Sequence, residues 1–255
     1  MDFYFKEIRE REEKHQQRLK DFNNNKQKEE RSLTHQFFKH NYNDKNKELF
    51  NILVRFSAAY KYRANKRGLF LCAKKNDLNT GVGKTLGMMV MSSIFEVKLR
   101  SMMKLTDRYE NESASFLDQI NNYTTYGSPH RRDLIVDDVG AETITNRYGK
   151  KEELFIKVVE ERYNKYIQQN EITHFTSNLG KDELINRYGE RVWSRLNQMC
   201  NIHEVSGFDQ RFINPPCVIP TINKIANQTN VNPQIAHITM DSTILDSYEN
   251  QQVIS

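Results

Sequence analysis

The sequence predicts an α/β protein in which a parallel sheet is flanked by helices and preceded by a helical arm. Short apolar runs alternate with segments of helical periodicity, an order typical of parallel sheets. The first 45 residues are dense in charge of both signs and contain neither Gly nor Pro, which favours an exposed helix. With 255 residues, the chain is long enough for one α/β domain with a core and smaller appendages.

Three parts follow from this pattern: an arm at residues 1–45, the α/β domain at 46–214 and a tail at 215–255. Apolar residues in the arm are too sparse for an independent core, so we expect it to dock on a partner, and Asn23–Asn25 is expected to break its helix. The tail is rich in Asn, Ile, Thr and Gln and contains no Lys or Arg from Asp241 onward. We therefore expect part of the tail to be disordered.

Periodicity places the elements of the α/β domain. A helix is expected at about 45–63, because its apolar residues recur on one face, and the run 68–72 after it is apolar throughout, as expected of a buried strand. The remaining expected strands are 134–136, 172–176 and 202–205, and the remaining expected helices are about 85–105, 151–169, 181–187 and 191–199.

The composition excludes several classes of protein. No stretch approaches the roughly 18 continuous apolar residues of a membrane span, and the N-terminus lacks the pattern of a signal peptide, so a cytoplasmic protein is expected. Cys72, Cys200 and Cys217 are too scattered for a disulfide framework or a zinc site. The net charge of +5 permits an anionic partner. The stretch 55–75 has seven Lys and Arg and no Asp or Glu, which fits either a nucleic-acid contact or a solvated helix face.

A glycine-rich loop between a strand and a helix is the strongest functional signal. Glycines allow backbone N–H groups to approach phosphate oxygens, and the following helix directs its positive end at the anion. Lys84 is expected to reach the β and γ phosphates of ATP, and the Thr85 hydroxyl to bind Mg²⁺. Leu78 replaces the first glycine of the full motif, and the loop is long, so we expect slow hydrolysis. The expected phosphate-binding residues are Gly81, Val82, Gly83, Lys84, Thr85 and Leu86.

Two further polar groups follow later strands. Asp137 and Asp138 end an apolar run, where Asp137 can hold Mg²⁺ and Asp138 can orient or deprotonate the attacking water. Asn178 follows the next strand along the chain, and its side chain can contact the γ-phosphate or position the water. An acidic turn and a helix N-cap are the structural alternatives for these two groups.

Arg191 and Arg195 lie four residues apart, on one face of a predicted helix. An arginine presented to the ATP of a neighbouring subunit would stabilise the charge that develops in phosphoryl transfer. A surface ion pair with Glu190 is the structural alternative. Both interpretations remain open from the sequence.

Together these segments resemble the DnaC/IstB group of AAA+ ATPases over residues 46–212. The resemblance rests on Gly-Val-Gly-Lys-Thr, Leu-Ile-Val-Asp-Asp-Val-Gly-Ala-Glu, Glu-Arg-Tyr-Asn, Thr-Ser-Asn-Leu and Arg-Tyr-Gly-Glu-Arg-Val-Trp-Ser-Arg-Leu. It implies an AAA+ P-loop NTPase fold, ATP with Mg²⁺, self-association with ATP at the subunit interface, and contact with single-stranded DNA. Lys84 and Thr85 match Walker A, Asp137 and Asp138 match Walker B, and Asn178 matches sensor 1. Arg191 or Arg195 matches the arginine-finger region, and Arg211 a later family arginine.

Three functions are compatible with this resemblance. The first is a loader that binds a replicative DNA helicase through residues 1–45, since that region binds the helicase in helicase loaders. The second is a transposition helper ATPase of the IstB kind, which shares the core and differs in its partner. The third is a nucleotide-binding module with little hydrolysis, which the altered glycine loop would suit.

Overall fold

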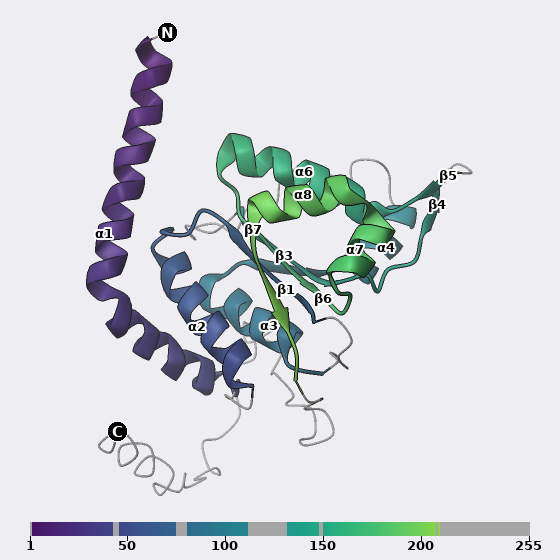
Figure 1. The fold of residues 1–255 in the computed structure, drawn as a ribbon, viewed down its shortest axis with the longest axis horizontal. Coiled ribbons are helices and arrows are strands. Elements are labelled where there is room, and N and C mark those ends of the chain that lie inside the picture. The colour runs from purple at the N-terminus through teal and green to yellow at the C-terminus, as the bar shows by residue number, and fades with distance from the viewer. Residues whose placement is uncertain are drawn as a thin grey trace, which may run out of the picture. The chain divides into compact units, whose positions relative to one another are not determined.

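The computed structural model describes residues 2–42, 46–74, 81–111, 132–147, 150–207 and 209. Its centre is a five-stranded parallel sheet in the order β2-β3-β6-β1-β7 (Figure 1). The strands are β1 (Gly68–Ala73), β2 (Lys98–Ser101), β3 (Leu134–Val139), β6 (Thr173–Ser177) and β7 (Cys200–Val205). The predicted α/β class, with a parallel sheet flanked by helices, is confirmed.

Helices cover both faces of the sheet, as Figure 1 shows. The helices that follow the arm are α2 (Lys47–Lys61), α3 (Lys84–Phe95), α4 (Met102–Asn111), α6 (Leu154–Gln169), α7 (Lys181–Tyr188) and α8 (Glu190–Met199). Side chains of β1 alternate between the two layers: Leu69 and Leu71 pack with α2 and α3, while Phe70 and Cys72 pack with the other helices. Burial on both faces explains why β1 reads as a continuous apolar run.

The N-terminal arm is a single helix, α1 (Asp2–Lys39), so the predicted break at Asn23–Asn25 is wrong. Side chains one turn apart support the helix there: the Asn25 amide donates to the Asp21 carbonyl at 2.9 Å, and the Gln17 amide donates to the Asp21 carboxylate at 2.8 Å. These bonds satisfy polar groups that otherwise favour turns.

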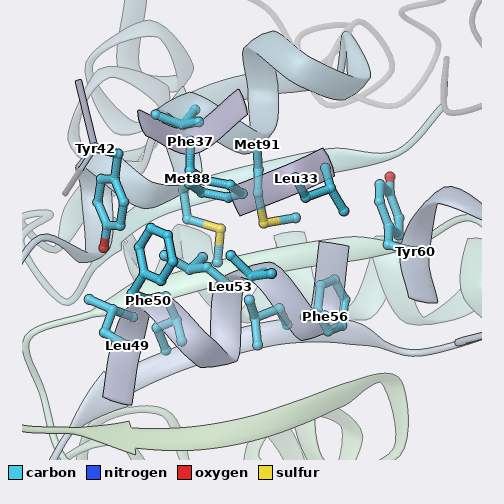
Figure 2. Packing of buried hydrophobic residues seen from close by; sticks show 14 of the residues in the cluster. Leu33, Phe37, Tyr42, Leu49, Phe50, Leu53, Phe56, Tyr60, Met88 and Met91 are labelled. Carbon is cyan, nitrogen blue, oxygen red and sulfur yellow. The ribbon is translucent and has the colours of Figure 1, made fainter. Parts of the chain in front are cut away.

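The C-terminal part of α1 belongs to the core. Figure 2 shows Leu33 and Phe37 among the side chains of α2 and α3, with Tyr42 at the end of the group. The Phe37 ring lies 5.6 Å from the Tyr42 ring and 6.0 Å from the Phe50 ring, both edge to face. Leu33, Phe37 and Tyr42 are therefore buried in the same core as side chains of α2 and α3.

Two element predictions need correction. The helix expected at about 85–105 is divided into α3 and α4 by β2, because Glu96 adopts a left-handed conformation (φ 55°) that ends α3. The helix expected from residue 151 begins at Leu154, because residues 145–152 contain the antiparallel strands β4 (Thr145–Arg147) and β5 (Lys150–Glu152). The tail at 215–255 and Leu78 lie outside the described residues.

Candidate nucleotide-binding site

The glycine loop leads directly into α3. Gly81 and Gly83 have positive φ angles of 73° and 101°, which glycine adopts without steric cost, and α3 begins at Lys84. A Cβ atom at Gly81 would lie 1.8 Å from Oδ1 of Asp209, and one at Gly83 would lie 3.3 Å from the Tyr42 hydroxyl. The side chains of Asp209 and Tyr42 therefore pack against these two positions and leave little space there for a Cβ atom. The first N–H groups of α3 provide positive potential for an anion.

Asp137 joins this loop to β3. Its Oδ1 accepts hydrogen bonds from the Thr85 hydroxyl at 3.1 Å and from the Thr176 hydroxyl at 2.6 Å. Burial raises the pKa of the Asp137 carboxyl, and these two hydrogen bonds partly oppose that effect. The structure thus places the residue expected to hold Mg²⁺ within one hydrogen bond of the hydroxyl expected to bind the same ion.

Lys84 is enclosed beside these groups, with 5% of its surface exposed. Burial lowers the pKa of its ammonium group, while Cys72, Asp138 and Asp137 act in the opposite direction. The Cys72 thiol is itself buried, and its pKa is raised to about 12, so it stays protonated near neutral pH. Asp138 and Asp137 therefore favour the charged form of the Lys84 ammonium group.

Asp138 and Asn178 also meet. Asp138 has a φ angle of 61°, its backbone N–H donates to the Thr176 hydroxyl at 2.9 Å, and its carboxylate accepts from the Asn178 amide at 3.0 Å. The pairing of β3 with β6 shifts between Val136 and Val139, at the position of these aspartates. This irregularity turns Asp138 toward Asn178, so the amide fixes the direction of the carboxylate.

Thr176 is a site residue that the sequence reasoning missed. Its hydroxyl donates to Asp137 and accepts from the backbone of Asp138, so it connects both aspartates to β6. Its position before Ser177 and Asn178 was the available signal, because the expected site lies at the carboxyl ends of neighbouring strands. Val82 and Leu86, in contrast, pack against the core and contribute backbone geometry.

The arginines of α8 form a separate group. Arg195 Nη1 lies 2.7 Å and Arg191 Nη2 lies 3.7 Å from Oε1 of Glu160 on α6. Both side chains therefore lie on one face of α8, as predicted. The carboxylate that pairs with them is Glu160, whereas the structural alternative named Glu190. The side chain of Arg191 is 78% exposed and that of Arg195 is 18% exposed. Among the described residues, no hydrogen bond links either arginine to Asp137 or Asp138. Arg211 lies outside the described residues.

A second missed group supports the loop after β3. Arg187 on α7 donates to the carbonyls of Gly140 and Glu142, each at 2.6 Å, and pairs with Glu153 at 3.2 Å. The buried Glu142 carboxylate accepts from the Gly140 N–H at 2.7 Å and from the Tyr188 hydroxyl. Glycine followed two residues later by glutamate was the sequence signal for this loop. These bonds hold the chain that leaves Asp138 against α7.

The Glu-Arg-Tyr segment has a structural role. Arg162 is 1% exposed and donates to the Thr173 hydroxyl at 2.7 Å and to the Glu171 carboxylate at 3.0 Å. It also donates to the carbonyls of Arg132 and Ile172. These partners stand at the amino ends of β3 and β6, whereas the candidate site is at their carboxyl ends. Arg162 therefore fixes the strands that carry the aspartates and Asn178.

The donors suit magnesium better than a metal that needs a protein cage. In the part of the chain that the structure describes, no three His, Cys, Asp or Glu side chains gather in a way that could hold a metal. Mg²⁺ is commonly held by one or two carboxylates together with substrate phosphates, which matches Asp137 and the adjacent Thr85.

None of the described helices combines the length and apolarity that a bilayer crossing requires.

Comparison with known proteins gives likenesses at the level of structure. No protein-family model matches the sequence, and no curated protein matches it. A solved structure described as a primosome component from Streptococcus pyogenes serotype M3 is 21% identical, with a TM-score of 0.45 over 65% of this chain and 81% of that chain. The DnaC helicase loader is 18% identical, with a TM-score of 0.45 over 61% of this chain and 89% of that one. DnaI is 17% identical, with a TM-score of 0.44 over 60% and 83% respectively.

Proposed function

We propose that this chain is an ATP-dependent DNA replication protein of the AAA+ class, of the DnaC helicase-loader type, which binds ATP with Mg²⁺ and single-stranded DNA in the cytoplasm. The observation that carries the nucleotide part is the hydrogen bond of 3.1 Å between the Thr85 hydroxyl and Asp137. It joins the glycine loop to the acidic strand at the carboxyl edge of a parallel sheet, where ligands of open α/β sheets bind. The motif resemblance over residues 46–212 supports the DNA part.

Each residue has a role in this proposal. The N–H groups at the start of α3 and the Lys84 ammonium bind the phosphates, and Thr85 and Asp137 hold the metal. Mg²⁺, when bound, adds positive charge that stabilises the phosphoryl group during transfer. Asp138 orients the attacking water and accepts its proton, and Asn178 keeps the Asp138 carboxylate in place through their bond of 3.0 Å.

Nucleotide binding is tested by comparing the wild-type chain with Lys84→Ala, and with Lys104→Ala as a control at an exposed lysine of α4. A hydrogen bond to a charged group is worth about 1.5–3 kcal/mol, so Lys84→Ala should weaken ATP binding roughly 10- to 150-fold. The control should bind as the wild type does. Equal affinity in all three proteins would contradict the proposal. Tight ATP binding without turnover, with and without single-stranded DNA, would select the nucleotide-binding module.

Self-association with ATP at the interface is part of the same proposal. Arg191 is the stronger candidate for a neighbouring site, because it is largely exposed and its bond to Glu160 is long, at 3.7 Å. Arg191→Ala and Asp138→Asn should each be inactive alone. A mixture of the two should regain ATPase activity, because some interfaces then combine an intact arginine with an intact aspartate. A mixture that remains inactive would contradict an arginine acting in trans.

The partner is tested by pull-down of a replicative helicase from the same source. A truncation should stop before Leu33, because Leu33 and Phe37 belong to the core. A chain lacking residues 2–20 should therefore retain ATP binding and lose the helicase. A helicase that ignores the full-length protein would refute the loader assignment. Stimulation of a transposase by the same protein would select the IstB-like alternative.

A further inference from the structure

A basic groove lies at the edge of the sheet opposite the candidate nucleotide site. Its lining residues lie on the first half of α1, in the loop at 63–66 before β1, and at 167–172, which spans the end of α6 and the connection to β6. The segments at 63–66 and 170–172 precede the strands β1 and β6, whereas the glycine loop and the aspartates follow strands, so the groove and the candidate site lie at opposite ends of the strands. The groove has a volume of about 640 Å³. It is therefore a separate feature that the nucleotide chemistry does not use.

Positive charge dominates its lining. The lining residues Arg11, Lys14 and Arg18 on α1 face Arg63 and Lys66, and Glu12 is the one carboxylate among the lining residues that the structure describes. Arg63 is engaged with the buried Asp133 at 3.1 Å. Lys66 lies 4.0 Å from Glu12, too far for a strong pair. Burial, Lys66 and Arg18 each lower the pKa of His15 in the same groove, while Glu12 raises it.

Lys14 and Arg18 are the cations available to a ligand. Within the described ranges, no carboxylate pairs with either side chain, and both are exposed. Arg11 is held by Glu7, one turn earlier on α1, at 2.5 Å. Lys14 and Arg18 both line the groove and face a second wall of the protein across it.

The arrangement fits a linear polyanion. Arg11, Lys14 and Arg18 recur at intervals of three and four residues, so they form one row along α1 about 10 Å long at 1.5 Å per residue. A row of cations of this kind can lie along the phosphates of a nucleic-acid backbone. The opposite wall offers the amides of residues 168–170. Amide side chains contact the phosphates, sugars and base edges of nucleic acids.

We propose that this groove binds the backbone of single-stranded nucleic acid, with Lys14 and Arg18 contacting phosphates and the amides of residues 168–170 facing the sugars and bases. The proposal deepens the proposed function, on which it rests, by assigning its DNA contact to a surface. Because groove and nucleotide site lie at opposite edges of the sheet, each can fail separately. The groove also explains the basic stretch at 55–75 in part, since Arg63 and Lys66 belong to it.

The test compares two double variants of the full-length chain that each remove one lysine and one arginine from α1. Lys14→Gln/Arg18→Gln changes the groove, and Arg9→Gln/Lys20→Gln changes exposed positions of α1 outside it. Fluorescence anisotropy of a labelled oligodeoxythymidylate of about 20 nucleotides gives the affinity at several salt concentrations. Each phosphate contact contributes roughly 0.7 to the slope of log K against log salt for single strands.

Loss of two contacts should therefore reduce the slope by about 1.4 and weaken binding roughly 60-fold at about 50 mM salt. The Arg9→Gln/Lys20→Gln control should keep the wild-type slope. A third variant, Glu12→Gln, should bind more tightly than the wild type, because it removes the carboxylate from the groove. Circular dichroism and ATP binding should be unchanged in all three proteins.

Several results would overturn the proposal. Equal losses in the groove and control variants would show a general effect of charge. A wild-type chain that binds ATP but not the oligonucleotide, or that binds an acidic peptide through Lys14 and Arg18 instead, would exclude a nucleic-acid site. Tighter binding of a duplex of the same length would exclude the single-strand assignment. A chain that fails to bind ATP but binds the oligonucleotide through this groove would refute the nucleotide part of the proposed function alone.

Discussion

Replacement of Arg162 tests whether the Glu-Arg-Tyr segment is structural. Arg162→Met keeps much of the apolar length of the side chain and removes the hydrogen bonds to Thr173, Glu171 and two backbone carbonyls. Breaking a buried ion pair by removing one partner costs about 3–5 kcal/mol, because the other charge is left buried. Arg132 lies 3.8 Å from Glu171 and can compensate in part. We therefore expect the free energy of unfolding to fall by about 3 kcal/mol, the lower end of that range.

The assay is urea unfolding of the wild type and of Arg162→Met, followed by ATP binding at low temperature, where the variant is folded. ATP affinity should be unchanged. A double variant, Arg162→Met/Glu171→Gln, should recover about 1 kcal/mol or more, because the isolated charge is removed. A stability within about 0.5 kcal/mol of the wild type would refute the reasoning. Loss of ATP binding without loss of stability would do so as well, by indicating a direct role at the nucleotide.

The remaining predictions concern the elements around the site. Phe37→Ala should lower the free energy of unfolding by about 3–5 kcal/mol in urea, because the ring is fully buried; a loss below about 1 kcal/mol would place it outside the core. Gly68→Ala should cost about 3 kcal/mol or more in thermal unfolding, because the new Cβ would lie 1.8 Å from the Thr173 carbonyl oxygen; an unchanged melting temperature would contradict this packing. Lys61 donates a hydrogen bond to Glu29 and lowers the pKa of that carboxyl from 4.5. The stabilisation that this pair gives the folded protein is therefore complete above pH 4.5, and it is lost as the pH falls through the lower pKa that Glu29 has in the folded protein. The stability difference between the wild type and Glu29→Gln should therefore be largest near neutral pH and shrink as the pH falls below 4.5, and a difference independent of pH would contradict the interaction.

Much of the candidate site could be predicted because its signals are local. The glycines that precede Lys84 are bounded by an apolar strand and a helix, and Asp137 and Asp138 end another apolar run. Carboxyl ends of parallel strands meet at one edge of a sheet, so the sequence order alone predicts that these groups approach one another. The hydrogen bond between Thr85 and Asp137 confirms that proximity.

Some of the missed features have weak local signals, and others depend on contacts between distant residues. The strand β2 is short, and its residues are only half-buried at the sheet edge, so its sequence carries no apolar run. The continuity of α1 through Asn23–Asn25 is supported by the hydrogen bonds that Gln17 and Asn25 donate to Asp21, which intrinsic helix propensity does not include. The partner of Arg191 and Arg195 lies on another helix, so spacing within the segment pointed to Glu190.

Roles within the acidic strand show the same limit. Sequence reasoning assigned Asp137 to the metal from its position, and the structure adds the two hydroxyls that hold its carboxylate. Thr176 was visible only as part of a short polar segment after a strand. Its contact with both aspartates arises from the pairing of β3 with β6, which a single sequence does not specify.

The central claim is that Thr85 and Asp137 hold one metal ion on a bound triphosphate. A double-mutant cycle on ATP affinity, with Thr85→Val, Asp137→Asn and the combined variant, measures this directly by calorimetry. In Mg²⁺ the two substitutions should show a coupling of about 0.5–3 kcal/mol, and in EDTA the coupling should disappear. Additive losses in Mg²⁺, or ATP binding that none of the three variants weakens, would contradict the account.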